Sequence, residues 1–315
     1  MQKVLYLRKV RDFGEKIGDS FLFLKGNWKN LLSIYAVFVV PLIIAASILG
    51  MFFAGRLYSA MLSNAVSIQV TDIFSGEFFV IILCLLMAGS SYNTAIYGYF
   101  RLYDEQKGVK PTISQVSQLF FPRFIKLFFY NIFVVILLVL VAVLPLAIIM
   151  FIPLVNLLGI LLFAVVFATV LFHLNCIYVA EDVGFWTGIS RLLDLFKDRW
   201  WPVIGYSSVM FIIYYVFASV IQVIFMMIFA VGALNMISPA YPPSDAGTSQ
   251  GKISMMVLAF GGMILLQQVF YLILYSAIGI NYYSLCEEKD GSAIEEEIES
   301  IGATTDKYGG VEEQY

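Results

Sequence analysis

Long apolar stretches without charged side chains dominate the pattern of the chain. Five of them exceed the roughly 20 residues that a helix needs to cross a bilayer. They lie between residues 29 and 56, 77 and 101, 126 and 181, 199 and 245, and 252 and 287. The third is long enough for two spans, and Pro145 and Pro153 bracket a short connection where the chain can turn back. The pattern therefore predicts about six transmembrane helices.

Amphipathic segments precede three of these spans. Residues 17–34 resemble residues 189–206, and a weaker copy begins at Ile113, where Thr112 and Gln115 form a capping-box pattern. Apolar positions at helical spacing form one stripe in each copy. The stripes are Phe13, Ile17, Phe21, Leu24 and Trp28 in the first, and Phe185, Ile189, Leu192, Leu193 and Phe196 in the last. We expect these segments to be helices that lie in the membrane interface.

The three copies predict an internal repeat. Each unit consists of one interfacial amphipathic helix and one helical hairpin, over about residues 11–105, 111–182 and 184–288. Because each unit holds an even number of spans, the units enter the membrane from the same side and are parallel. The alternative is chance, since any amphipathic helix before any apolar helix looks similar. We predict an all-α polytopic membrane protein with one membrane domain, residues 1–289.

Composition and charge add orientation to this picture. The chain is 61% hydrophobic and only 13% charged, which suits a lipid environment. Of its Lys and Arg residues, only Arg56 and Lys252 fall on one side of the predicted spans. The excess of Lys and Arg marks the cytoplasmic side, so we expect both termini there, in a bacterial inner membrane. Residues 290–315 form an acid-rich tail, in which Ser292 and Glu295 predict a short helix before a disordered end.

Catalytic patterns are scarce in this sequence. His173 is the only histidine, and there is no HExxH, phosphate-binding loop or GxSxG motif. Cys84, Cys176 and Cys286 are isolated from one another and predict core packing. We expect no catalytic, metal or cofactor site and no nucleic-acid partner.

Polar residues inside the predicted spans are the first set of candidate positions, because each is costly in hydrocarbon without a partner. The candidates are Asn93, His173, Asn175, Gln267 and Asn281. Asn175 and Asn281 each precede the acidic pair of their unit by the same number of residues. They either line a shared polar region or hydrogen-bond between helices and hold the bundle together. For His173 the alternatives are a proton relay and a structural histidine.

Acidic pairs at the ends of the second, fourth and sixth spans are the second set. They are Asp104 and Glu105, Glu181 and Asp182, and Glu287 and Glu288. One interpretation is a cytoplasmic docking ring. The other is ion pairing that fixes the geometry of each unit, with Lys25, Arg123 and Lys197 as the available bases.

The opening segment RDFGEKIGDSFLFLKGNWK, from Arg11 to Lys29, the repeat and the six-span plan resemble a group of uncharacterised bacterial six-span membrane proteins. That group is similar to the membrane domain of glycerophosphoryl diester phosphodiesterases. True phosphodiesterases carry a separate catalytic domain, and this chain has a short acidic tail in its place. The resemblance therefore implies a membrane domain without hydrolytic activity.

Two main functions are compatible with these patterns. The first is a non-catalytic membrane protein that binds membrane lipid or a membrane-protein partner. The second is a small-solute or lipid transporter with a polar pathway among the three hairpins. A membrane enzyme is a weaker third alternative, because an acid or base would still be needed and candidates are few.

Overall fold

The computed structural model describes residues 5–63, 75–150, 153–237 and 246–291, and these residues form helices joined by short connections. The predicted acidic tail and the proposed cap at Ser292 lie outside the described residues. The helices in chain order are α1 (Phe13–Phe38), α2 (Val40–Ser63), α4 (Gly76–Glu105), α5 (Ile113–Met150), α6 (Pro153–Glu181), α7 (Phe185–Phe196), α8 (Trp200–Ile237) and α9 (Ala246–Asp290).

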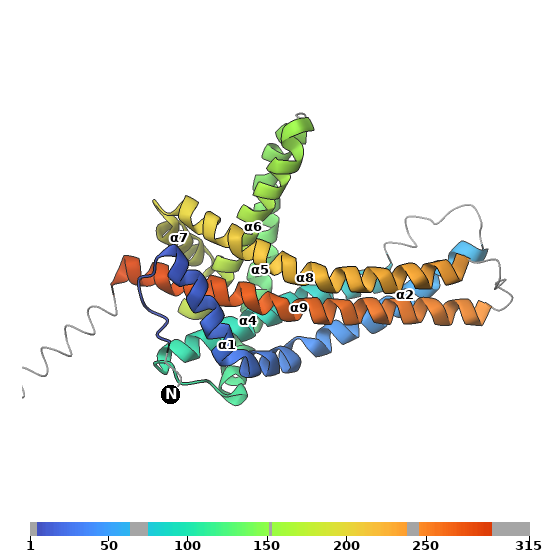
Figure 1. Cartoon of the computed structure of the whole chain (residues 1–315), viewed down its shortest axis with the longest axis horizontal. Coiled ribbons are helices and arrows are strands. Elements are labelled where there is room, and N and C mark those ends of the chain that lie inside the picture. The colour runs from blue at the N-terminus through green and yellow to red at the C-terminus, as the bar shows by residue number, and fades with distance from the viewer. Residues whose placement is uncertain (1–4, 64–74, 151–152, 238–245, 292–315) are drawn as a thin grey trace, which may run out of the picture.

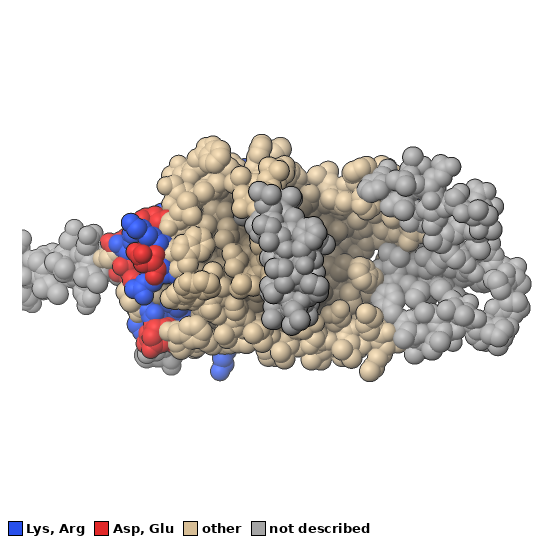
Figure 2. All heavy atoms as spheres, turned by 90° about the horizontal axis from the view of Figure 1, so that it is seen from above, with Lys and Arg blue, Asp and Glu red and all other residues tan. Residues whose placement is uncertain are grey.

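Five helices in the described part of the chain are long and apolar enough to cross a membrane, and α1 with α2 can supply a sixth span as a bent pair. Figure 2 shows most Lys, Arg, Asp and Glu side chains in view gathered at one end of the molecule, while the described part of the flanks is almost entirely uncharged. Apolar flanks of this kind are suited to lipid rather than water. The protein is an all-α polytopic membrane protein, as the apolar pattern predicts.

The first span is bent by 44° where α1 meets α2. Val39 ends α1, and Pro41 is the second residue of α2. Proline has no backbone N–H and its ring clashes with the carbonyl of the preceding turn, which accounts for a break at this point. α5 continues through Pro145 to Met150 and α6 begins at Pro153, so the second hairpin turns within the stretch that the two prolines bracket.

The helices divide into a long bundle and a hairpin that leans away from it. In Figure 1, α2, α4, α8 and α9 extend together along the longest axis, whereas α5 and α6 rise steeply from their side. α9 packs against α8, α2 and α1, and α4 joins the bundle to α5 and α6. The three hairpins are thus not arranged alike, and the predicted repeat stays a prediction.

A separate amphipathic helix is present before only one of the hairpins. α7 is a helix of its own, because the chain leaves the helical conformation at Lys197 and Asp198 takes a positive φ of 63°. The first and second amphipathic segments instead continue into their spans as α1 and α5. These two segments are therefore not separate helices, since nothing breaks α1 before Val39, and their position in the membrane interface stays a prediction.

Part of the predicted stripe of α1 faces outward from the bundle, while Ile17 and Leu24 pack partly against the core. Phe13, Phe21 and Trp28 are exposed, whereas the buried face of α1 carries other residues. That buried face consists of Ser20, Phe23, Asn27, Leu31, Ile34 and Tyr35. Two polar side chains thus lie inside the bundle, at the part of α1 nearest the charged end.

Candidate functional site

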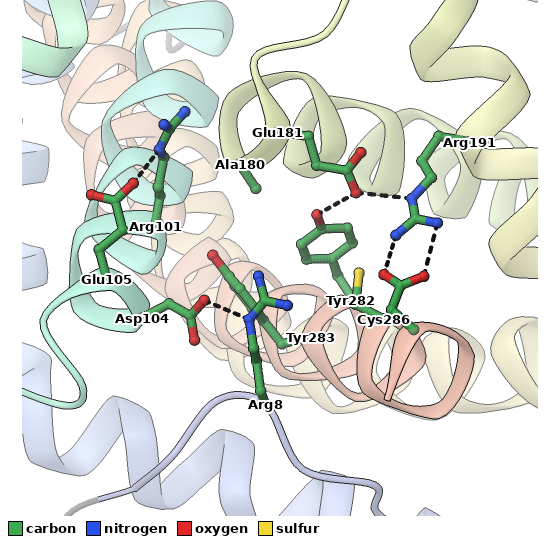
Figure 3. Close-up of a pocket in the computed structure, with 11 residues that line it drawn as sticks. Arg8, Arg101, Asp104, Glu105, Ala180, Glu181, Arg191, Tyr282, Tyr283 and Cys286 are labelled. Atoms are coloured by element: carbon green, nitrogen blue, oxygen red, sulfur yellow. Dashed lines mark hydrogen bonds and ion pairs between the residues drawn. The ribbon is translucent and has the colours of Figure 1, made fainter. Parts of the chain in front are cut away.

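The charged end is formed where the N-terminal segment, the last turns of α4, α6 and α9, and helix α7 meet. A pocket of about 280 Å³ opens there, and Figure 3 shows its lining side chains. The lining is Arg8, Arg101, Asp104, Glu105, Ala180, Glu181, Arg191, Tyr282, Tyr283, Cys286 and Asp290. Three of the predicted acidic residues, Asp104, Glu105 and Glu181, therefore come together in one place.

Arg191 of α7 is the central cation of this pocket. Its Nε donates to Glu181 at 3.0 Å, and its two terminal nitrogens donate to the two carboxylate oxygens of Asp290. Tyr282 also donates to Glu181, at 2.9 Å. The hydrogen bond to Asp290 raises the pKa of Arg191 above its usual value; burial acts in the opposite direction, and Glu181 adds to the increase. One permanently charged guanidinium thus holds the ends of α6, α7 and α9 together.

The other arginines of the pocket also face carboxylates. Arg8 Nε donates to Asp104 at 2.9 Å, which fastens the N-terminal segment to the end of α4. Arg101 Nε donates to Glu105 at 2.7 Å, one helical turn away. The positive and negative charges in the pocket largely compensate each other.

The remaining predicted acidic residues lie near this pocket. Asp182, which follows α6, accepts from Arg123 and from Lys126, each at 3.0 Å. Although burial alone would raise the pKa of Asp182, the hydrogen bond from Lys126 and the charge of Arg123 lower it below its usual value. Glu288 forms an ion pair with Arg199, and Glu287 is buried.

These contacts match ion pairing within the protein better than a ring of free carboxylates. Arg123 is a partner as expected, whereas Lys25 and Lys197 form no ion pair in the part of the chain that the structure describes. Their expected places are taken by Arg8 and Arg199, because those guanidinium groups reach the acidic ends directly. Within the described residues, Asp104, Asp182 and Glu288 each pair with a base from, or just before, their own predicted unit.

The buried Arg11 is a residue that the sequence did not single out. It is only 6% exposed, and its guanidinium donates to Asp19 at 2.6 Å and to the carbonyls of Leu7 and Tyr6. Its backbone N–H donates to Ser284 of α9 at 3.2 Å. Arg11 thus anchors the N-terminal segment to α1 and α9, and no motif in the sequence marks it.

A second polar group lies deeper, between α1, α6 and α9. Asn281 Nδ2 lies 3.0 Å from His173 Nε2, and Lys16 Nζ donates to Asn281 Oδ1 at 2.9 Å. His173 Nδ1 lies 2.8 Å from the carbonyl of Thr169. Since a carbonyl can only accept, Nδ1 carries the proton, and Nε2 accepts from Asn281. This assignment makes the histidine neutral and satisfies both ring nitrogens.

Within the described ranges, the other candidate positions inside the spans form no hydrogen bond to the group of Lys16, Asn281 and His173. Asn175 is buried, its Oδ1 has no partner among the described residues, and no hydrogen bond joins it to Asn281. Asn93 donates to the carbonyl of Gly89 at 2.9 Å, and Gln267 donates to Tyr214 at 3.5 Å. Among the described residues Asn281 thus bonds to His173 of α6 and not to Asn175, and a polar region shared by Asn175 and Asn281 stays a prediction.

Metal ligands and cysteine thiols are two further features that bear on possible chemistry. Among the described residues, no group of three or more His, Cys, Asp and Glu side chains is placed to hold a metal ion. Cys176 and Cys286 are buried and Cys84 is partly exposed, all as free thiols.

Comparison with known proteins adds no assignment. No protein-family model matches the chain, and no curated protein or solved structure matches it significantly.

Proposed function

We propose that the chain is a non-catalytic multi-pass protein of a bacterial cytoplasmic membrane, whose cytoplasmic face binds a membrane lipid or a membrane-protein partner. The charged end is this face, and both termini lie on its side. The bias of Lys and Arg toward one side of the spans supports this orientation.

The observation that carries the proposal is the position of the pockets. Four pockets in the described part of the chain all have Lys or Arg in their lining and open at the charged end. Two of them, of about 280 and 680 Å³, are large enough for a polar headgroup or several side chains of a partner. These pockets support recognition at the charged end, because each places basic side chains beside open space.

The proposal includes the predicted repeat, in which amphipathic helices lie in the membrane interface. The exposed rings of Phe13 and Trp28 on α1 and of Trp186 on α7 are near the charged end. Aromatic rings favour the boundary between hydrocarbon and headgroups. We infer that these helices lie in the cytoplasmic interface, where they can contact lipid directly.

A small-solute carrier is less well supported. It would need polar side chains that face a water-filled path across the membrane. His173 and Asn281 are instead bonded to each other, and each is at most 1% exposed. Hydrogen bonds of this kind hold helices together in membrane proteins.

The test is native mass spectrometry of the protein extracted together with its surrounding lipid. We expect a lipid or a protein to accompany the wild-type chain in fixed stoichiometry. Arg191→Ala, which disrupts the end of α6, α7 and α9, should weaken this retention. Arg56→Ala is the matched control, because it removes an ion pair with Glu77 at 2.9 Å on the other side of the spans.

Three outcomes are informative when both variants elute and melt like folded protein. Loss of the companion in Arg191→Ala but not in Arg56→Ala supports recognition at the charged end. Equal loss in both variants contradicts it. A wild-type chain that carries nothing beyond the bulk lipid composition would overturn the proposed function.

A further inference from the structure

A groove of about 680 Å³ lies between α1 and the connection that follows α4, separate from the pocket around Arg191. Its lining consists of Leu5, Leu22, Phe23, Lys25, Gly26, Asn27, Trp28, Tyr103, Gly108 and Lys110. The groove is thus built from the N-terminal segment, α1 and the end of α4, all at the charged end.

The charge of this groove differs from that of the pocket in Figure 3. Two lysines, Lys25 and Lys110, line the groove, and no Asp or Glu is among its lining residues. The pocket around Arg191 instead combines three arginines with four carboxylates. Lys25 forms no ion pair among the described residues. The groove therefore favours an anion, whereas the pocket is close to charge balance.

The apolar part of the groove faces the outside of the bundle. Leu22 and Trp28 on α1 are 45% and 50% exposed. Lys29 places its ammonium 5.7 Å from the centre of the Trp28 ring. A tryptophan beside lysines at the end of a span is typical of the headgroup level, where one side of a ligand is apolar and the other is charged.

The floor of the groove is held in place by buried contacts. Tyr99 of α4 donates to Asn27 Oδ1 at 2.8 Å, and Asn27 Nδ2 donates to the carbonyl of Phe23 at 2.9 Å. Lys110 Nζ donates to the carbonyl of Gly26 at 2.7 Å, which fixes the connection after α4 against α1. The floor of the groove and Lys110 are therefore held in place before a ligand binds, which reduces the ordering that binding requires.

We propose that this groove binds the phosphate headgroup of an anionic phospholipid from the cytoplasmic leaflet. Lys25 and Lys110 contact the phosphate, and Leu22 and Trp28 contact the upper part of the acyl chains. The inference rests on the proposed function, because it specifies the lipid and requires the charged end to be cytoplasmic. A free phosphate would use the lysines but not the apolar wall, so the groove suits a lipid better.

The test is lipid titration of the purified, delipidated full chain in detergent, followed by native mass spectrometry. The probes are phosphatidylglycerol and the zwitterionic phosphatidylcholine of the same acyl chains. We expect the wild-type chain to bind the first phosphatidylglycerol more tightly. Lys25→Gln with Lys110→Gln should weaken that binding about fivefold for each lysine, the usual contribution of a basic residue near an anionic surface.

Matched variants separate the groove from net charge and from misfolding. Lys9→Gln with Lys289→Gln removes the same charge from two exposed lysines of the charged end that lie outside the groove, and should leave binding unchanged. Lys25→Arg with Lys110→Arg keeps the charge and should retain most of the preference. Soluble glycerol phosphate at millimolar concentration should not displace the lipid; efficient displacement would contradict a lipid site.

The outcomes also distinguish this inference from the proposed function. If the groove variant binds phosphatidylglycerol like the wild type, or no more weakly than the control variant, the groove proposal is wrong. A wild-type chain that then still carries a companion after native extraction leaves the proposed function standing. If the wild type shows neither lipid preference nor a companion, both proposals fail.

Discussion

Polar side chains inside the bundle are bonded across helices rather than left open to a pathway. Lys16, Asn281 and His173 come from α1, α9 and α6, and the contacts between them are 2.9 and 3.0 Å long. The amide of Asn281 is suited to this position because it donates to one neighbour and accepts from the other. A carboxylate or a second cation there would meet the wrong partner on one side.

Removal of this amide tests the role of the chain of hydrogen bonds. Asn281→Ala leaves Lys16 Nζ and His173 Nε2 without the partner that the structure gives them. An unsatisfied buried polar group costs about 1–3 kcal/mol, so we expect the free energy of unfolding to fall by that order. Unfolding in mixed detergent micelles, followed by circular dichroism, measures the change.

Gln267→Ala is the control for this substitution. Gln267 makes one long hydrogen bond of 3.5 Å and is only partly buried, so its loss should have a much smaller effect. Equal destabilisation by the two variants would show that the Asn281 contacts have no special role.

Close helix contacts depend on glycine at particular places in the elements. A Cβ at Gly279 of α9 would lie 2.5 Å from the ring of Phe100 in α4, which is fully buried. Phe100 in turn stacks on Phe23 of α1, with ring centroids 4.3 Å apart. Small residues let membrane helices approach closely, and here one glycine permits the contact between α9 and α4.

We therefore expect Gly279→Ala to cause a packing defect between α9 and α4. The added methyl group displaces Phe100, and overpacking of a filled core costs about 1–3 kcal/mol. The thermal unfolding midpoint of the purified protein should fall. Gly205→Ala in α8 adds the same atom where nothing lies within 4 Å, and should not lower the midpoint. If the Gly279 variant is as stable as the wild type, the close approach of α4 and α9 is incorrect.

Most charged side chains of the described residues gather at one end of the molecule, and largely uncharged flanks lie beside it (Figure 2). Arg8 and Asp290 line the same pocket, so the first described residues and the end of α9 lie on the same side. An even number of spans places both ends of the chain on the same side of the membrane. Which side is cytoplasmic follows from the lysine and arginine bias and can be measured.

Thiol labelling of cells tests this orientation. In a Cys84→Ser background, Lys9→Cys should react with a membrane-impermeant maleimide only after the cells are permeabilised. Glu77→Cys, at the start of α4, should react in intact cells, because its position is partly exposed on the other side of the spans. The reverse pattern would invert the proposed topology, and reaction of both in intact cells would contradict a membrane span between the two positions.

Much of the fold follows from local sequence. Charge-free apolar stretches identify the spans, since each helix satisfies its own backbone and crosses the bilayer largely independently of its neighbours. The capping box at Thr112 and Gln115 is present, with reciprocal bonds of 2.8 and 3.4 Å. The acidic ends of α4, α6 and α9 lie near basic residues in the structure, because all are at the same end of the spans.

Only the tertiary structure decided which partners meet. Arg11 and Ser284 are separated by 273 residues, Lys16 and Asn281 by 265, and Arg191 and Asp290 by 99. No local pattern encodes such pairs, because lipid is as apolar as the helix surfaces and hydrophobicity does not select a neighbour. The lean of α5 and α6, the pairing of His173 with Asn281 and the basic groove beside Trp28 all depend on that choice of neighbours. The sequence by itself thus determined that the chain crosses the membrane and where its charges lie, and the packing of α1, α4, α6 and α9 determined which side chains form its sites.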